Sequence, residues 1–315
     1  MRARGLPAVV TLHTVHTCLS LNRGCAWCRR LPSFDHFDVE QYQKTIGELA
    51  RKVIVHQEAP IRQVLLRQGI RNDRVVTVPH GTLMLRAPQK AAAKAALGID
   101  GEAPLLVAFG YFEPSKNALV LIEAFRKVKR QVPDTKLWIG GFVRYPTPES
   151  LVYRSKCEAL VHRLGLTNDV TLANCSVPEQ RVPDVLGAAD VACFIYDEDT
   201  RSASGALHRA IGLGRAVVAS RIPKFHEVSF FSDETLVNPQ SASEAARVLV
   251  RLLQDSSFRQ AVEQRTLDYA EQTTWSTIAR RHLLIYNEVA ASDPVVPFGC
   301  ELGSHVGGTG DNCSV

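Results

Sequence analysis

Short apolar runs alternate with stretches of helical periodicity along most of the chain. Each apolar run is the length of a strand, and each periodic stretch presents an apolar face at helical spacing. The predicted strands are residues 9–15, 52–56, 75–78, 105–109, 136–139, 170–173, 191–196 and 216–219, and the predicted helices are residues 39–50, 60–68, 118–131, 149–164, 178–188 and 204–213. This alternation is typical of a parallel sheet covered by helices on both faces, so the pattern predicts an α/β protein.

The pattern divides near Pro79, His80 and Gly81, where a predicted strand ends in turn residues. Residues 1–78 contain material for a small α/β domain. Residues 79–273 form a larger domain, and their part from residue 103 to residue 239 predicts one Rossmann-like, doubly wound parallel sheet. We therefore expect two α/β domains of unequal size.

The C-terminal part of the chain has a different character. Residues 243–289 show helical periodicity only, and the apolar and aromatic positions of the last helix are Trp275, Ile278, His282, Leu283 and Tyr286. We expect residues 274–292 to form a crossover helix that packs on the N-terminal domain through this face. Residues 293–315 are rich in Gly, Ser and Pro and have no periodicity, which is typical of a disordered tail.

Composition and charge narrow the class of protein. The chain has 315 residues, is 45% hydrophobic and 22% charged, and carries a formal net charge of +5 that is scattered among acidic residues. These values are ordinary for a globular protein of about two domains, and they weakly favour anionic small molecules over nucleic acid. No apolar run reaches the length of a membrane span or of a signal peptide core, so we expect a soluble, cytoplasmic protein.

The N-terminal cysteines raise the question of a metal site. Cys18, Cys25 and Cys28 follow His13 and His16, and the C-A-W-C spacing of the last two thiols suits zinc. No second pair of this kind follows, and the histidines fall on or near a predicted strand. The better interpretation is a loop with incidental thiols, so no metal is predicted.

The loops after the strands of the larger domain are where ligands of a doubly wound sheet bind. The loop after residue 109 begins at Gly110 and reaches Lys116 at the mouth of a predicted helix. Glycine lets backbone approach a ligand closely, and the lysine adds its charge to the positive end of the helix dipole, which together suit a diphosphate. A solvated lysine in a turn fits the same residues equally well. Gly140, after the next strand, is a further position where backbone can lie against a ligand.

The loop after residue 196 ends at Ser204 and Gly205, at the start of another predicted helix. Small residues at a helix start leave N–H groups free for an anion, which predicts a second phosphate contact facing Lys116. The competing interpretation is an ordinary serine N-cap.

Six motifs, in a fixed order, carry a family resemblance that covers roughly residues 9–289. They are V-V-T-L-H-T-V, V-P-H-G, F-G-Y-F-E-P-S-K-N, L-G-A-A-D-V, S-A-S-G-A-L-H-R-A-I-G-L-G-R-A-V-V-A-S and T-W-S-T-I-A-R-R-H-L. The series resembles the GT-B retaining glycosyltransferases (glycosyl transferases group 1), the family of sucrose synthases, mannosyltransferases and bacterial glycogen synthases. The resemblance implies two facing Rossmann-like domains and transfer, with retention, from a nucleoside diphosphate sugar bound to the C-terminal domain.

The resemblance also implies roles for single residues. Lys116 matches the lysine that neutralises the leaving diphosphate, and Ser204 and Gly205 match the helix start that holds the distal phosphate. His13 matches a histidine near the donor sugar, although a histidine in a half-buried strand is as often structural. Glu227 matches a glutamate near the nucleotide half of the donor, with a surface carboxylate as the equal alternative. The nucleotide sugar is the donor substrate, and no cofactor is expected.

Several positions depart from the family pattern. Most relatives have two glutamates eight positions apart, and here Arg201 and Arg209 stand at these positions. Tyr111 replaces an arginine that often accompanies the family lysine. A carboxylate of residues 197–199 could substitute for the first glutamate, but none is in register for the second.

The N-terminal domain is also shorter than in the family, which leaves three hypotheses open. The first is an active glycosyltransferase acting on an unknown carbohydrate, lipid or small-molecule acceptor. The second is a non-catalytic nucleotide-sugar-binding subunit, with a partner chain that supplies the missing N-terminal portion, or a truncated gene product. The third is another GT-B enzyme, such as a phosphorylase or an epimerase.

Overall fold

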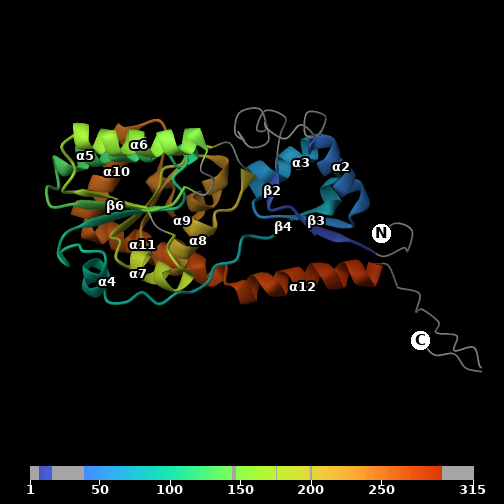
Figure 1. Ribbon diagram of the computed structural model, residues 1–315. Coiled ribbons are helices and arrows are strands. Elements are labelled where there is room, and N and C mark those ends of the chain that lie inside the picture. Colours follow the sequence, from blue (N-terminus) through green and yellow to red (C-terminus); the bar gives the residue numbers. More distant parts are fainter. Residues whose placement is uncertain (1–6, 16–38, 144–146, 175, 199–200, 293–315) are drawn as a thin grey trace, which may run out of the picture.

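The computed structural model describes residues 7–15, 39–143, 147–174, 176–198 and 201–292, which form two α/β lobes joined side by side (Figure 1). His16, Cys18, Cys25 and Cys28, which were considered as zinc ligands and interpreted as a loop with incidental thiols, and the C-terminal segment 293–315 lie outside the described residues. No helix in the described ranges is both long and apolar enough to cross a membrane.

The large lobe is built on a six-stranded parallel sheet with the strand order β11-β10-β8-β5-β6-β7. Its strands are β5 (Leu105–Phe109), β6 (Lys136–Gly141), β7 (Val170–Asn174), β8 (Val191–Phe194), β10 (Val217–Ser220) and β11 (Leu236–Val237). The predicted doubly wound sheet is therefore confirmed. Strand β11 was not predicted, because two residues are too short to produce a periodic signal.

Helices cover both faces of this sheet, as Figure 1 shows. One face carries α5 (Ala118–Lys129), α6 (Pro148–Arg163) and α10 (Ala242–Gln254), and the other carries α4 (Lys90–Ala96), α7 (Val182–Gly187), α8 (Gly205–Gly212), α9 (Ser229–Ser232) and α11 (Ser256–Gln272). Side chains of one strand alternate between the two cores: Leu106 packs with the first helix layer, and Leu105 and Val107 pack with the second. Burial on both faces explains why strands such as β5 (LLVAF) and β8 (VACF) are apolar without interruption.

The small lobe is a three-stranded parallel sheet with the order β1-β3-β4. Its elements are β1 (Val9–Thr11), β3 (Lys52–Val55), β4 (Val75–Thr77), α2 (Val39–Leu49) and α3 (Gln63–Arg67), with a π-helical turn η3 (Glu58–Arg62) and a 3-10 turn η4 (Asn72–Arg74). One face of the sheet packs on the small lobe's own residues, among them Ile61 and Leu65. The other face is covered by a helix from the C-terminal part of the chain.

That helix is α12 (Trp275–Ser292), which leaves the large lobe and runs along the small one (Figure 1). Ile278 and Ile285 pack on Ile54 and Val78, so the expected crossover helix is present. Its predicted contact face was partly wrong, because Trp275, Leu283 and Tyr286 are exposed, whereas Ile278, Ile285 and Val289 are buried. A sheet of three strands offers room for one narrow stripe of the helix, and the aromatic residues fall outside it.

The predicted strand at residues 9–15 is interrupted at His13. Strand β1 belongs to the small sheet, whereas β2 (Thr14–Val15) pairs antiparallel with β9 (Arg201–Ser202) of the large lobe. One continuous segment therefore contributes a strand to the small lobe and a second strand that connects it to the large lobe.

Candidate functional site

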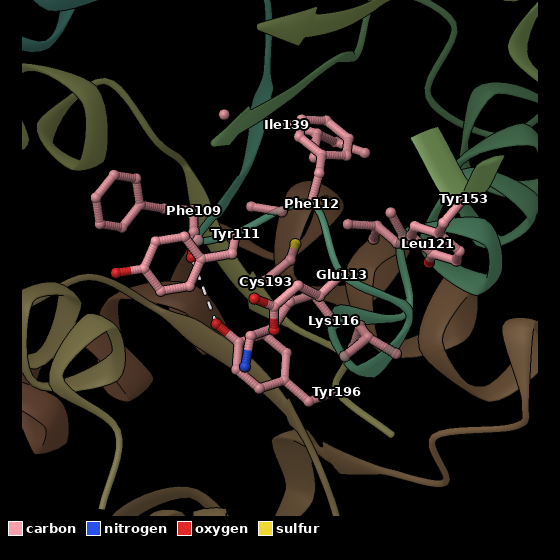
Figure 2. Close-up of a pocket in the computed structure, with 15 residues that line it drawn as sticks. Phe109, Tyr111, Phe112, Glu113, Lys116, Leu121, Ile139, Tyr153, Cys193 and Tyr196 are labelled. Atoms are coloured by element: carbon pink, nitrogen blue, oxygen red, sulfur yellow. Dashed lines mark hydrogen bonds between the residues drawn. The ribbon is translucent and has the colours of Figure 1, made fainter. Parts of the chain in front are cut away.

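Two loops at the carboxyl edge of the large sheet are bonded directly to each other. The amide of Asp197, after β8, donates to the carbonyl oxygen of Ser115, after β5, over 2.9 Å. The Tyr196 hydroxyl donates to the Phe109 carbonyl oxygen over 3.4 Å, as the dashed line in Figure 2 shows. Lys116 ends the short helix η5 (Pro114–Lys116), and its Nζ lies 4.1 Å from the centre of the Tyr196 ring. The loops predicted to meet therefore do meet, with Lys116 between them.

Lys116 shares a carboxylate with a second lysine. Its Nζ lies 3.5 Å from Oε1 of Glu198, and Nζ of Lys224 lies 3.1 Å from the same oxygen. Burial lowers the pKa of Lys116 below its ordinary value; Glu198 acts in the opposite direction, and the neighbouring charge of Lys224 adds to the lowering. The three groups form a compact, partly buried site, and Glu113 also acts on Lys116 by its charge.

The strand order explains this arrangement. Lys116 follows β5, Glu198 follows β8, and Lys224 lies in η7 (Pro223–Val228), which follows β10. Because β8 lies between β5 and β10, Glu198 lies between the two lysines along the edge of the sheet. Sequence analysis missed Lys224, although it follows a predicted strand and so had the same positional signal as Lys116.

The glycines of the two neighbouring strand ends permit a very close backbone approach. The amide of Gly110 donates to the Gly140 carbonyl oxygen over 3.0 Å. A Cβ atom on Gly141 would lie 1.6 Å from the Gly110 carbonyl oxygen, and one on Gly140 would lie 1.7 Å from the Trp138 ring. Gly110 and Gly140 line the pocket that Lys116 and Tyr196 also line (Figure 2). They therefore lie where the sequence placed them. Packing against Trp138 excludes a side chain at Gly140, whereas a Cβ atom on Gly110 would lie 3.2 Å from the Tyr196 hydroxyl.

Helix α8 begins beside this site. Ser204 has an extended backbone and its Oγ accepts from the Leu207 amide over 3.3 Å, so it is an N-cap as the competing interpretation held. Gly205 is exposed, and nothing would lie within 4 Å of a Cβ atom there. The cap uses the Leu207 amide, and the earlier amides at Gly205 and Ala206 precede it at the open end of the helix. The capping role and the anion-binding role are therefore compatible.

His13 lies at the seam between the lobes, at the bend that separates β1 from β2. Its Nδ1 is 2.8 Å from Nε2 of His56, and the next residue, Thr14, pairs with Ser202. Nζ of Lys224 donates to the hydroxyl of that same Ser202 over 2.8 Å. The structure thus connects the His13 segment to the Lys224 side of the site.

A row of histidine rings continues along the seam. Ring centres are 4.9 Å apart for His13 and His56, 5.7 Å for His56 and His80, and 4.4 Å for His80 and His208. The row ends on Glu227, whose Oε2 lies 3.0 Å from Nε2 of His208. Within the described part of the chain, no group of three or more His, Cys, Asp or Glu residues is arranged to hold a metal ion.

Glu227 is buried, so the alternative of a surface carboxylate is wrong. It is 3% exposed, and the Tyr269 hydroxyl donates to its Oε2 over 3.1 Å. Burial alone would raise the pKa of Glu227, but His208 and the Tyr269 hydroxyl hold this pKa below its ordinary value. The carboxylate beside Lys116 is Glu198, whereas Glu227 contacts side chains of α8 and α11.

The row of histidines predicts that the fold loses stability in mild acid. Burial, with His208 and His56 nearby, lowers the pKa of His80 to about 4. Between this value and the ordinary value of 6.5 the unfolded chain binds a proton that the folded chain does not, so stability falls as the pH falls. We expect His80 to account for a loss of about 2 kcal/mol between pH 7 and pH 5.

Urea unfolding of the unaltered chain and of His80→Asn at both pH values measures this loss. The groups facing His80 are His56, His208, Glu227 and the Trp275 ring, and His56 shifts in the same direction. The variant should therefore be less sensitive to acid without being insensitive. Equal losses in the two proteins would contradict the assignment to His80.

The large lobe is similar to a known protein family. Residues 103–255 match a family model described as Glycosyl transferases group 1. This segment of the large lobe is therefore similar to glycosyl transferases group 1. The match spans the whole six-stranded sheet and the segments that carry Lys116, Glu198 and Lys224.

Two curated relatives of this chain are named for inositol compounds. A D-inositol 3-phosphate glycosyltransferase of Nocardia farcinica is 28% identical over 196 residues, 60% of this chain and 42% of the relative. A phosphatidyl-myo-inositol mannosyltransferase of Mycolicibacterium smegmatis is 26% identical over 183 residues, 58% of this chain and 44% of the relative. The matched part therefore spans less than half the length of either relative.

Solved structures extend the likeness to both lobes. HepE of Anabaena in complex with UDP superposes with a TM-score of 0.73 at 17% identity, covering 90% of this chain and 72% of that one. A glycosyltransferase from Rickettsia africae superposes with a TM-score of 0.68 at 17% identity, covering 89% and 70%. The chain therefore has the GT-B fold.

The residues that differ from the family pattern have defined contacts in the structure. Arg209 forms an ion pair with Glu179, and the backbone of Arg201 pairs with Val15 of the small lobe. Tyr111 packs edge to face on Phe142, with ring centres 5.2 Å apart. Of the candidate carboxylates, Glu198 lies beside Lys116, Asp197 accepts from Gln240, and residue 199 is outside the described ranges.

Proposed function

We propose that this protein transfers a sugar, with retention of configuration, from a nucleoside diphosphate sugar to an acceptor. The observation that carries the proposal is the position of the Lys116 ammonium, held between the bonded loops after β5 and β8 at the carboxyl edge of the sheet. Ligands of doubly wound sheets bind at this edge, and a fixed positive charge there stabilises a departing diphosphate.

In such a sugar transfer the protein must stabilise the negative charge that develops on the leaving diphosphate. Lys116 supplies an ammonium, and the open end of α8 at Gly205 supplies amides and the positive end of a helix dipole. Both are in place before the donor arrives, so little reorganisation is needed during the reaction. The donor brings its own transferable group, and the proposal includes no cofactor.

The names of the relatives indicate the class of donor and of acceptor. The HepE structure holds UDP, which is the leaving group of a uridine diphosphate sugar. The acceptors named for the relatives are inositol compounds, which are polyols carrying phosphate. For this chain we propose a nucleoside diphosphate sugar as donor and leave the acceptor open among carbohydrates, lipids and small molecules.

A second candidate is a subunit that binds the nucleotide sugar while a partner chain performs the transfer. The ion pair between Arg209 and Glu179 favours it, because a family glutamate is replaced there by a guanidinium engaged elsewhere. An arginine cannot accept hydrogen bonds from sugar hydroxyls as a carboxylate does. Product formation from a panel of nucleotide sugars separates the two candidates, since only the first predicts turnover by the chain alone.

Replacing Lys116 by alanine tests the diphosphate assignment. Loss of a charge-assisted contact in a partly buried site should weaken the affinity for UDP or GDP by about 10- to 100-fold. Calorimetric titration of the full chain measures the effect. Lys127→Ala removes an exposed lysine from the outer side of α5 and should leave the affinity unchanged. Unchanged affinity in Lys116→Ala would refute the proposed function of this loop.

A further inference from the structure

The rings of His13 and His56 are joined by a hydrogen bond, and neither the sequence motifs nor the family match gives His56 a role. We propose that His56 is a positioning residue: it keeps the ring hydrogen of His13 on Nδ1, so that Nε2 of His13 accepts a hydrogen bond from a hydroxyl group of the bound sugar. The inference rests on the proposed function, because the sugar is that of the same donor.

The strand order of the small sheet places the two histidines and a backbone carbonyl group in one line. His13 comes after β1, His56 directly follows β3, and Val78 directly follows β4. Because β3 lies between β1 and β4 in a parallel sheet, His56 lies between His13 and Val78 at the carboxyl edge. The Val78 amide donates to the Val55 carbonyl oxygen over 2.8 Å, which holds this edge in register.

The backbone determines which nitrogen of His56 carries the hydrogen. His56 is 8% exposed, and its Nδ1 lies 3.1 Å from the Val78 carbonyl oxygen. A carbonyl oxygen only accepts, so Nδ1 of His56 must be the donor. Burial lowers the pKa of His56 below its ordinary value, so the ring is neutral at neutral pH and has a single N–H group. Its Nε2 is therefore an acceptor.

His56 in turn determines which nitrogen of His13 carries the hydrogen. Nδ1 of His13 lies 2.8 Å from Nε2 of His56. Since that Nε2 accepts, Nδ1 of His13 must donate, and a neutral His13 ring then has its lone pair on Nε2. Free neutral histidine in water prefers the opposite form, with the hydrogen on Nε2. The contact with His56 therefore selects the less common tautomer of His13.

His13 lies beside the candidate diphosphate site. It is exposed, and within the described ranges no hydrogen bond engages its Nε2. The next residue, Thr14, begins β2, on the side of the small lobe that faces the large one (Figure 1). Thr14 pairs with Ser202, whose hydroxyl accepts from Nζ of Lys224 over 2.8 Å. The segment that carries His13 is therefore fastened to the side chains that surround Lys116.

A sugar at this site needs acceptors as well as donors. Each hydroxyl group of a sugar can donate a hydrogen bond, whereas the ammonium groups of Lys116 and Lys224 can only donate and cannot receive one. Nε2 of His13 supplies an acceptor, provided that its hydrogen stays on the other nitrogen. The tautomer that His56 selects is thus the one that suits a sugar hydroxyl.

Nitrogen-15 NMR of the full chain, labelled in its histidine rings, reads the tautomers directly, because ring nitrogens with and without a hydrogen resonate far apart. At neutral pH we expect both His13 and His56 to carry the hydrogen on Nδ1. His162 is the reference, because it is exposed on α6 and its ring has no contact among the described residues. It should show mainly the ordinary form, with the hydrogen on Nε2.

Two substitutions of His56 separate its two contacts. His56→Asn keeps a donor for the Val78 carbonyl oxygen but is too short to reach His13, so the His13 hydrogen should move to Nε2. His56→Gln gives up that donor but places an acceptor near the former Nε2, so His13 should keep its hydrogen on Nδ1. A role of His56 in stability alone predicts the same His13 tautomer in both variants, and that result would overturn the inference.

Binding to the full chain measures the effect on the sugar. The probes are UDP and UDP-glucose, with GDP and GDP-mannose as a second pair. His56→Asn should weaken the affinity for the sugar nucleotide that binds best by about 2- to 10-fold, the effect of one hydrogen bond, and leave the affinity for its diphosphate unchanged. His13→Phe should show the same loss, and His56→Gln should retain most of the affinity. Should His56→Asn fail to fold, the tautomers of the unaltered chain and the binding by His13→Phe decide.

The two proposals fail in distinguishable ways. If His13 carries its hydrogen on Nε2 in the unaltered chain, the inference is refuted whatever binds. If Lys116→Ala weakens binding of the diphosphate while His56→Asn and His13→Phe bind sugar nucleotides as the unaltered chain does, the proposed function survives and the role of His56 is refuted. If none of the four nucleotides binds, the proposed function is refuted together with the sugar contact.

Discussion

An Ile285→Asp substitution is expected to unfold the small lobe. Ile285 is 7% exposed and packs on the face of the small sheet formed by Ile54 and Val78. An unpaired carboxylate in that contact loses the burial of an isoleucine and adds the cost of desolvating a charge, together about 4 kcal/mol or more. A loss of this size approaches the total stability of many domains.

Leu284→Asp is the matched control, because the neighbouring side chain on the same helix is 70% exposed. We expect its stability to change by no more than about 0.5 kcal/mol. Urea unfolding and solubility after expression measure both variants. Chains ending at Thr274 and at Ser292 provide a coarser comparison, in which only the first should aggregate. Equal behaviour of the two aspartate variants would contradict the packing of α12 on the small sheet.

A Gly141→Ala substitution is expected to damage the site and the fold together. The added Cβ would lie 1.6 Å from the carbonyl oxygen of Gly110 and 2.7 Å from its carbonyl carbon, and neither is the end of a flexible side chain. The strand ends must therefore move apart, which breaks the hydrogen bond from Gly110 to Gly140 and shifts the loop that carries Lys116. We expect a loss of about 3 kcal/mol in stability, the range typical of overpacked sites.

The thermal midpoint and the UDP affinity of Gly141→Ala should fall together. Gly205→Ala makes the same chemical change at the start of α8, where the space for a Cβ is open and the backbone is not left-handed. Its thermal midpoint should stay close to that of the unaltered chain. A thermal midpoint for Gly141→Ala as high as that for Gly205→Ala would mean that the two strand ends are not in contact in solution.

Much of the fold was accessible from the sequence because strand and helix periodicity is a local property. The strand predicted at residues 105–109 coincides with β5, and the helix predicted at residues 118–131 differs from α5 only at its end. A parallel sheet also has a general rule for where ligands bind, so Gly110, Lys116, Ser204 and Gly205 could be nominated from their positions alone.

Periodicity predicted the structure less well where neighbouring residues of one segment lie in different environments. The predicted strand at residues 9–15 splits at His13 because its second half pairs with Ser202 of the other lobe. The face of α12 was misjudged because its exposed aromatic residues carry the same apolar signal as its buried aliphatic ones. In both cases a distant partner determines which residues are buried, and no local pattern records that partner.

The sequence by itself determined the α/β class, the large parallel sheet and the place of Lys116 at its carboxyl edge, because these follow from short-range periodicity and from the rule for strand ends. Only the tertiary structure decided that Glu198 and Lys224 join Lys116 and that Glu227 is buried against His208 and Tyr269. The physical reason is strand order: β8 lies between β5 and β10, so three residues far apart in the sequence become neighbours along one edge. Strand order depends on how the helices pack over both faces, which no single segment of the chain encodes.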